Sequence, residues 1–355
     1  MAQGETPFRG NAFRSLKELR AWHEATVEEA LEPDLPIIDP HHHLWENQQR
    51  GRYLIHDLVE DLSGGHKIVA TLFEECGAMY RNYGPEAMKP VGETEFVVGV
   101  GAMSDSGFYG PTRICAGIIG YADLSLGERV QEVLEEQIRA GRGRFRGIRD
   151  GVQFDPAISY APGQRLRRPG LLKESQFRAG FARLATLGLT FDAWMFQPQL
   201  ADLVDIAQAF PGTTIVLNHF GGVVGVGPYA SRRNEMFEAW RGSIRELARC
   251  PNIVVKAGGL GMLYCGFDFH LRSTPPGSEE LAAAWRPYVE TTLEAFGADR
   301  CMFESNFPVD KQSCSYTVLW NALKRIAQRY SPQEKAALFS GTAARIYRID
   351  LPPAA

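Results

Sequence analysis

Short apolar, β-branched runs alternate with longer amphipathic stretches from about Leu35 to Tyr347. This alternation is typical of repeated strand–helix units whose strands form a parallel sheet. Eight runs predict strands: Leu35–Pro40, Ile68–Phe73, Ile114–Tyr121, Phe145–Arg149, Leu189–Trp194, Thr214–Leu217, Ile253–Lys256 and Cys301–Phe303. Eight such units in one chain predict an α/β fold of the (β/α)8 barrel (TIM barrel) type.

The stretches after these runs have helical periodicity, and several end in Gly, a common helix stop. The main ones are residues 127–141, 173–188, 198–210, 233–250, 279–297, 315–330 and 331–349. A doubly wound open sheet is the main rival fold, but it requires a Gly-rich phosphate-binding turn after the first strand, where this chain has Pro-His-His-His. The barrel is therefore preferred.

An amphipathic stretch, Ser15–Leu31, precedes the first predicted strand and is expected to pack as a helix across one end of the barrel. We divide the chain into an N-terminal extension with this helix, residues 1–34, and a barrel with its closing helices, residues 35–355. Three long loops rich in Gly, Pro and aromatic residues follow strands: residues 151–169, 221–233 and 258–278. Loops after strands form the catalytic face of a barrel, so these three predict a substrate lid.

Composition narrows the function classes. The 355 residues carry a formal net charge of −4 without a basic stripe, which argues against a nucleic-acid partner. No apolar run is long enough to cross a membrane, and the polar N-terminus lacks the features of a secretory signal. The six cysteines are scattered and predict reduced core thiols. We expect a cytoplasmic protein with a small-molecule substrate, and the sequence leaves homo-oligomerisation open.

The segment IIDPHHHLW ends the first predicted strand and carries the strongest chemical pattern. Side chains alternate between the faces of a strand, so Asp39, His41 and His43 are expected on one face and His42 on the other. Two imidazoles at this spacing can hold one cation or one carbonyl oxygen together. We therefore assign His41 and His43 to the active site and His42 to structure.

Further segments follow the other predicted strands: FEEC at residues 73–76, FRGIRD at 145–150, IVLNHFGG at 215–222, GFDFH at 266–270 and CMFESNFPVD at 301–310. Together with Asp-x-His-x-His, they resemble the amidohydrolase superfamily over nearly the whole barrel. Within it they are similar to the branch of sugar-acid lactonases and 2-pyrone-4,6-dicarboxylate lactonase. The resemblance implies a hydrolase that opens a cyclic ester.

The resemblance also implies roles for particular residues. His219 joins His41 and His43 around the scissile carbonyl or a divalent metal, for which zinc is the first choice; no organic cofactor is expected. Independently of the resemblance, Glu75 ends the second predicted strand and is the expected anionic ligand if a metal is present, whereas Glu74 is expected to face away into solvent. This branch contains metal-dependent and metal-free enzymes, and in a metal-free site the histidines would polarise the carbonyl directly.

The eighth strand departs from the superfamily pattern, because Asn306 stands where most members have a carboxylate that takes a proton from water. A carboxamide can orient a water molecule but has no useful basicity. Asp310, Glu75 and His270 are the candidates for a replacement base. Alternatively, Glu304 and Asp310 form ordinary ion pairs with Arg300 and Lys311.

Other residues after the strands are candidates for substrate binding. Arg149 matches an arginine that grips a substrate carboxylate in similar lactonases, and its planar guanidinium suits this role. Trp194, Gln197, His270 and Tyr80 predict an aromatic wall with polar donors, with Tyr160, Tyr264 and Phe267 as further members. For Trp194 the alternative is packing in the barrel core.

The sequence thus predicts a hydrolase in which His41, His43 and His219 stabilise an oxyanion, Asn306 holds a water and Asp310, Glu75 or His270 takes its proton. Two rivals stay open at this point. One is a non-hydrolytic lyase, such as a metal-assisted decarboxylase, since loss of the usual base weakens the hydrolytic mechanism. The other is a catalytically silent binding protein.

Overall fold

A computed structural model describes residues 14–47, 50–158 and 167–350. Its centre is an eight-stranded parallel sheet in which every strand lies beside the preceding strand of the sheet. In order, the strands are β1 (Ile37–His42), β4 (Ile68–Glu74), β5 (Arg113–Gly120), β6 (Phe145–Ile148), β7 (Thr190–Ala193), β8 (Ile215–Leu217), β9 (Ile253–Ala257) and β10 (Cys301–Phe303). All eight strands predicted from the sequence are confirmed.

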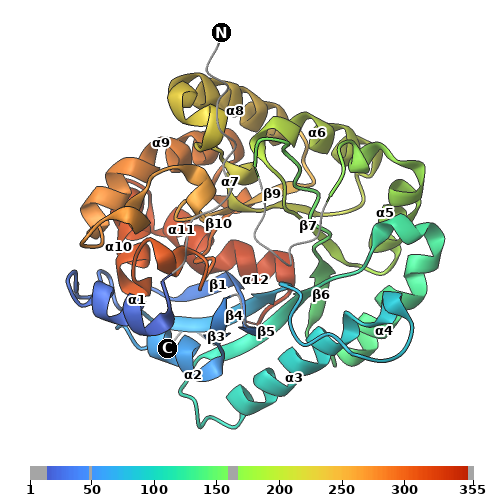
Figure 1. Ribbon diagram of the computed structural model, residues 1–355, viewed down its shortest axis with the longest axis horizontal. Helices are drawn as coiled ribbons and strands as arrows, with labels where there is room; N and C mark the ends of the chain where they lie inside the picture. Colours follow the sequence, from blue (N-terminus) through green and yellow to red (C-terminus); the bar gives the residue numbers. More distant parts are fainter. Residues whose placement is uncertain (1–13, 48–49, 159–166, 351–355) are drawn as a thin grey trace.

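The first and last strands meet, so that the sheet forms a nearly closed barrel (Figure 1). An isolated parallel bridge joins His42 to Phe307. The backbone N–H of Asn306 donates to the carbonyl oxygen of His41 at 3.0 Å, and that of His43 donates to Phe307 at 2.8 Å. These bonds place the segment after β10 directly against the histidine run. The predicted (β/α)8 architecture is confirmed.

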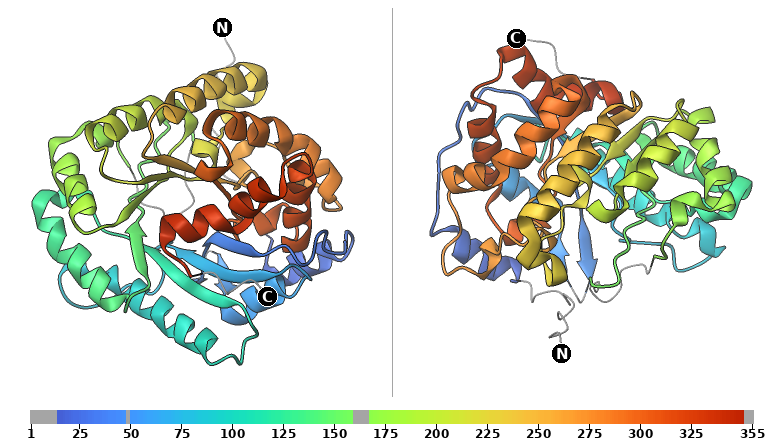
Figure 2. Two further views of the ribbon diagram at one scale, coloured as in Figure 1. Left: turned by 180° about the vertical axis from the view of Figure 1, so that it is seen from behind. Right: turned by 90° about the horizontal axis from the view of Figure 1, so that it is seen from above.

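Helices surround the strands, as the views from behind and from above show (Figure 2). They are α2 (Ile55–Leu62), α3 (Val91–Asp105), α4 (Val130–Ala140), α5 (Ser175–Thr186), α6 (Leu200–Ala209), α8 (Arg233–Ala248), α9 (Ser278–Phe296), α10 (Tyr316–Ala327), α11 (Pro332–Ala336) and α12 (Thr342–Tyr347). A π-helical segment, Ala337–Gly341, separates α11 from α12 within the last predicted helical stretch. A short antiparallel hairpin, β2 (Trp45–Asn47) with β3 (Gly51–Tyr53), follows β1.

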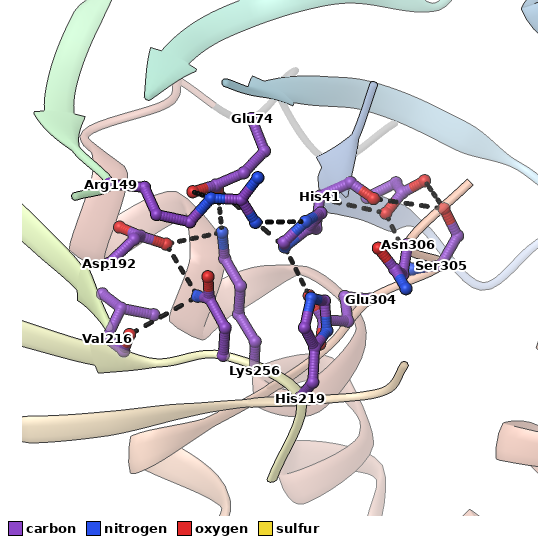
Figure 3. A network of polar contacts seen from close by, with 12 residues as sticks. His41, Glu74, Arg149, Asp192, Val216, His219, Lys256, Glu304, Ser305 and Asn306 are labelled. Carbon is purple, nitrogen blue, oxygen red and sulfur yellow. Dashed lines mark hydrogen bonds and ion pairs between the residues drawn. The ribbon is translucent and has the colours of Figure 1, made fainter. Parts of the chain in front are cut away.

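The barrel interior is layered. An apolar cluster fills the part of the interior away from the carboxyl ends of the strands, and Tyr347 and Ile349 pack into it. Its strand residues include Ile38, Ala70, Leu72, Val216, Val254 and Met302. Above it, towards the carboxyl ends of the strands, the interior side chains are charged or polar and fully buried (Figure 3). The polar side chains therefore lie at the end of the barrel where this fold usually carries its active site.

The N-terminal helix is shorter than predicted. α1 spans Leu16–His23 instead of Ser15–Leu31, with Ser15 as its N-cap. Beyond it, Glu28 accepts a hydrogen bond from the backbone N–H of Ser278 at 2.7 Å and another from Asn321 at 2.9 Å. The backbone of this segment also bonds to other elements: the N–H of Leu31 donates to Asn321 at 2.8 Å, and its carbonyl oxygen accepts from Lys324 at 2.7 Å. As expected, α1 lies against one end of the barrel, where Trp22 donates to the carbonyl oxygen of Arg272 at 3.2 Å.

Two sequence expectations about the chain as a whole have structural counterparts. All six cysteines are free thiols, and five of them are buried. Within the described ranges, no helix combines the length and apolar character needed to cross a bilayer. The thiols therefore act as core residues, as predicted.

Candidate active site

His41 and His43 reach the barrel mouth from the end of β1. The register between β1 and β4 shifts between Asp39 and His42, around Pro40, which has no N–H for the ladder. The shift turns His41 into the interior, where Ile38 also lies. The Nε2 atoms of His41 and His43 are 3.3 Å apart, and Nδ1 of His43 lies 2.8 Å from the carbonyl oxygen of Glu74. The two imidazoles thus converge on one point.

The same shift corrects the predicted position of Asp39, which does not share the face of His41 and His43. Asp39 accepts hydrogen bonds from the hydroxyl groups of Ser305 at 2.6 Å and Tyr316 at 3.0 Å and from the backbone N–H of Ser305 at 3.0 Å. Burial raises the pKa of Asp39 to about 6, although these donors oppose the rise. Asp39 therefore ties β1 to the segment after β10. His42 also faces away from the site, with Nε2 2.9 Å from the hydroxyl of Thr71.

His219 comes from the turn after β8 and shares a buried carboxylate with His41. Nδ1 of His219 lies 2.8 Å from Oε1 of Glu304, and Nδ1 of His41 lies 2.9 Å from Oε2 (Figure 3). His219 has a φ of 53°, which turns the chain so that its ring meets that of His41 at a centroid distance of 4.5 Å. The carboxylate of Glu304 therefore connects His41 and His219.

The alternative ion pair between Glu304 and Arg300 is wrong. The guanidinium of Arg300 donates instead to the carbonyl oxygens of Ala248, Cys250 and Phe296 at 2.9–3.2 Å. It holds α8 and α9 at the other end of β10. One end of this short strand thus serves packing and the other serves the site.

The two glutamates at the end of β4 have the opposite orientations to those predicted. Glu74 is fully buried inside the barrel, with Oε2 3.9 Å from Nδ1 of His41. Glu75 is turned to Arg149, whose Nε donates to its carboxylate at 2.9 Å and whose NH2 donates to its carbonyl oxygen. The side chains of β4 alternate as expected, but the inner face of the barrel holds Ala70, Leu72 and Glu74 instead of the face with Glu75. The expected metal ligand Glu75 is instead a partner of Arg149.

Beneath the histidines lies a buried ion cluster that the sequence interpretation missed. Nζ of Lys256 is 2.7 Å from Oε2 of Glu74 and 2.7 Å from Oδ2 of Asp192. Tyr347 donates its hydroxyl to the same oxygen of Asp192 at 2.8 Å, and Asn218 donates its amide there at 3.1 Å. A lysine inside the apolar strand IVVKA is the signal that points to this cluster, since an unpaired buried charge is very costly.

The electrostatics of the site follow from burial. Burial raises the pKa of Glu304 to about 8, and burial together with the negative charge of Asp192 raises that of Glu74 to about 8. Burial also holds the pKa of His41, His43 and His219 well below the ordinary histidine value, and nearby positive charges add to this. For His43 these charges belong to Arg149 and Arg50. The imidazoles are therefore neutral at physiological pH.

Asn306 and Asp310 form one unit beside this group. Nδ2 of Asn306 donates to Oδ1 of Asp310 at 2.7 Å, and the backbone N–H of Gly261 donates to Oδ2 at 2.8 Å. Asp310 is fully buried, and burial raises its pKa well above the ordinary value. The amide nitrogen of Asn306 is thus held by Asp310, and its oxygen is the end that can accept a hydrogen bond from a water.

The predicted substrate-binding residues lie in different surroundings. Arg149 is in the site, with NH1 3.4 Å from Nε2 of His41, but its other nitrogens are bonded to Glu75. Trp194 packs edge-on against His219 at a centroid distance of 5.1 Å. Gln197 donates to the carbonyl oxygen of Met236 at 2.9 Å and accepts from the N–H of Val224 at 3.2 Å, so both ends of its amide bind backbone.

Three aromatic or histidine candidates lie in loops after the strands. His270 is buried in a short 3-10 helix, Phe269–Leu271, in the loop after β9. Tyr80 is half-buried in the loop after β4. Tyr264 packs against Phe196 at a centroid distance of 5.5 Å, in a small cluster that also includes Trp194. Tyr160, with part of the predicted 151–169 lid, lies outside the described residues.

The donor set fits a divalent cation. His41, His219 and Glu304 each offer a ligand atom, all within 4.8 Å of one another, and two histidines with a glutamate form a known catalytic zinc set. In the described part of the ion-paired cluster, four carboxylates (Glu74, Glu75, Asp192, Glu304) face two permanent cations, Arg149 and Lys256. When all four carboxylates are ionised, as metal binding requires of its ligands, two negative charges remain, which a divalent cation would balance.

Comparison with known proteins agrees with this arrangement. The family model described as amidohydrolase matches residues 38–349. The chain is 34% identical to the uncharacterized protein y4mH of Sinorhizobium fredii, with 89% of this chain and 99% of the relative aligned. It is 26% identical to an L-fucono-1,5-lactonase of Burkholderia multivorans, with 89% and 97% aligned. A zinc-bound amidohydrolase structure from Burkholderia multivorans superposes with a TM-score of 0.64 at 24% identity, covering 88% of this chain and 99% of that one.

The match spans the whole barrel, from β1 to the end of α12, and includes every strand that contributes to the site. The chain belongs to the amidohydrolase family, and it is a hydrolase. The superfamily resemblance inferred from the sequence motifs is confirmed.

Proposed function

We propose that this hydrolase opens a lactone by adding water to the carbonyl carbon of the cyclic ester, which breaks the ring C–O bond and releases a hydroxy acid. The observation that carries the proposal is the convergence of His41, His43 and Arg149 on one point, next to Asn306, whose backbone N–H donates to the carbonyl oxygen of His41. The guanidinium of Arg149 can donate to a developing oxyanion, and Nε2 of His43, whose Nδ1 faces the carbonyl oxygen of Glu74, can accept a hydrogen bond from water. The lactonase relatives support a cyclic ester as the substrate class.

In this proposal each residue of the site has its own role in the reaction. Arg149 donates to the carbonyl oxygen of the substrate and stabilises its negative charge, and the neutral imidazoles of His41, His43 and His219 lie around the same place. Asn306, positioned by Asp310, accepts a hydrogen bond from the attacking water through its side-chain oxygen. Among the described residues, Oε1 of Glu74 has no hydrogen-bond partner; it lies 3.5 Å from Nε of Arg149, and we assign to it the removal of the water proton. A carboxylate with a pKa of about 8 is well matched to a proton transfer near neutral pH.

A divalent metal, with zinc as our first choice, would be held by His41, His219 and Glu304. When bound, it would polarise the substrate carbonyl as a Lewis acid. His43 and Glu75, which the sequence interpretation included among the ligands, then have other roles: Nε2 of His43 can accept a hydrogen bond from water, and Glu75 orients Arg149. The zinc-bound relative supports this choice.

The function is tested with two lactones of different charge, L-fucono-1,5-lactone and 2-pyrone-4,6-dicarboxylate. Ring opening is followed by absorbance and by mass spectrometry of the products in H₂¹⁸O. We expect one labelled oxygen in the product carboxylate and no carbon dioxide. Carbon dioxide release from the dicarboxylate would instead identify a decarboxylase, and no turnover of any lactone in a broader panel would favour a binding protein.

The base assignment predicts that Glu74→Gln lowers kcat on the preferred lactone by roughly 10²–10⁴-fold, the range typical of a lost general base. Asp310→Asn is expected to have the smaller effect, since Asp310 acts through Asn306. Both variants are assayed across pH, with the metal content measured. A Glu74→Gln enzyme that keeps the acidic limb of the wild-type pH profile would exclude Glu74, and a larger loss in Asp310→Asn would make Asp310 the base.

The metal assignment predicts that zinc stabilises the chelator-treated protein more at pH 8 than at pH 6. Glu74 and Glu304 have folded pKa values near 8, above the ordinary 4.5, so the folded chain binds their protons more tightly than the unfolded chain. Without metal, the free energy of unfolding therefore falls as pH rises through this window. Metal binding needs the ionised carboxylates, and free zinc at 100 times its Kd adds about 2.7 kcal/mol of stability.

Thermal unfolding of the metal-free protein, with and without zinc, measures this difference. Glu304→Gln removes the shared ligand and should abolish the zinc-dependent rise in Tm at both pH values. Exposed Glu235 pairs only locally with Arg232, so Glu235→Gln is the matched control and should respond like the wild type. Equal zinc shifts at the two pH values, or a full shift in Glu304→Gln, would contradict the assignment.

A further inference from the structure

The hairpin β2–β3 follows the catalytic histidines directly and carries a stacked series of side chains. The ring of Trp45 stacks on that of His43, with centroids 5.9 Å apart and planes 28° from parallel. The guanidinium carbon of Arg50 lies 5.1 Å from the Trp45 ring centroid. Two stacking contacts therefore connect this arginine to the histidine group, which lies at the mouth of the barrel.

Arg50 differs from the other cations of the site in having its charge unpaired. Lys256 is bonded to Glu74 and Asp192, and Arg149 is bonded to Glu75. Within the residues that the structure describes, the guanidinium of Arg50 forms no ion pair, and the side chain is half-buried. Its charge still reaches His43, where it contributes to the lowered pKa of the imidazole. A half-buried arginine without a counter-ion is a natural place for an anion.

A second, independent feature lies beside it. The indole of Trp45 is only 7% exposed, and its buried Nε1–H has no hydrogen-bond partner in the part of the chain that the structure describes. Buried donors are almost always paired, so an orphan donor points to a group that the chain itself does not supply. The indole N–H and the guanidinium are both donors, and neither can accept a hydrogen bond. Both groups therefore need a hydrogen-bond acceptor as a partner, and the positive charge of the guanidinium favours an anionic acceptor.

We propose that Arg50 and the indole N–H of Trp45 form a carboxylate-binding subsite beside His43, which selects lactones that carry an acid group. This inference rests on the proposed lactone hydrolysis and specifies its substrate class. It also moves the expected carboxylate anchor from Arg149, whose guanidinium is already bonded to Glu75, to the hairpin. Arg149 then faces the scissile carbonyl, close to His41.

Binding of unreactive probes tests the subsite without relying on catalysis. Isophthalate carries two carboxylates on a flat ring, and isophthalamide has the same shape without charge. Wild-type protein should bind isophthalate more tightly than isophthalamide, measured by calorimetry or by tryptophan fluorescence. Arg50→Met should weaken isophthalate binding by roughly 10- to 100-fold, and Trp45→Phe, which keeps an aromatic ring but removes the indole N–H, by about 2- to 10-fold.

Arg52 on the same hairpin gives a matched control, because it is exposed and pairs with Asp57 at 3.6 Å. Arg52→Met should bind both probes like the wild type. Thermal unfolding of each variant separates a lost contact from a damaged hairpin. Equal losses on the two probes, an unchanged isophthalate affinity in Arg50→Met, the same loss in Arg52→Met, or no wild-type preference for isophthalate would each overturn the subsite.

The same variants connect the subsite to turnover. The ratio of kcat/KM for 2-pyrone-4,6-dicarboxylate to that for L-fucono-1,5-lactone should fall by at least tenfold in Arg50→Met and stay unchanged in Arg52→Met. If the wild type hydrolyses neither lactone, the proposed function fails, and the probe measurements still decide the subsite. If it hydrolyses lactones and the ratio does not move, the function stands and the subsite is wrong.

Discussion

Replacing His41 or His43 by alanine is expected to lower kcat by about 10³-fold or more while the circular dichroism spectrum stays that of the native fold. The reason is the position of the two side chains. Their Nε2 atoms meet 3.3 Å apart at the carboxyl end of β1, where side chains serve chemistry, whereas the apolar core of the barrel lies in other layers. Steady-state kinetics on the preferred lactone provide the measurement.

His42 gives the control for this prediction. It lies between the two residues in sequence, faces the other way and contacts Thr71, so His42→Ala should cost roughly 1–3 kcal/mol of stability and leave most of the turnover. His219→Ala should reproduce the loss of His41→Ala from a different strand, because both rings share Glu304. An active His41→Ala enzyme would show that the reaction takes place elsewhere.

Lys256→Met is expected to destabilise the protein by about 3–5 kcal/mol, the usual cost of removing one partner from a buried ion pair. Lys256, Glu74 and Asp192 are fully buried, and the two carboxylates would lose the cation that both contact at 2.7 Å. Urea-induced unfolding monitored by fluorescence gives the free energy. Lys335→Met, which breaks a partly exposed pair with Glu32, should cost less than about 1 kcal/mol.

A compensating variant separates lost charge balance from lost packing. Adding Glu74→Gln and Asp192→Asn to Lys256→Met removes the uncompensated negative charge and should recover at least half of the lost stability. The triple variant is expected to be inactive, since Glu74 is the proposed base. If it is as unstable as Lys256→Met alone, the lysine contributes through packing and not through charge.

The sequence determined the architecture because its signals are local. The eight β-branched runs, separated by stretches of helical periodicity, predicted the strands and their order in the sheet. Hydrophobic periodicity of this kind is the main sequence signal of strands and helices. The histidines at the ends of β1 and β8 could be found in the same way, because a polar residue directly after a buried strand lies at the catalytic end of a barrel. The motif segments around them were sufficient to identify the family.

Only the tertiary structure decided which side chains of each strand meet. Alternation gives two faces but not which face is inward, so Glu74 and Glu75 were interchanged, and the register shift at Pro40 separated Asp39 from His41. Beyond the end of helix α1, Glu28 bonds to Ser278, 250 residues further along, and the backbone N–H of Leu31 bonds to Asn321, 290 residues further along. Glu304, Lys256 and Asp192 meet His41 through closure of the barrel. Such contacts join distant parts of the chain, and no local pattern encodes them.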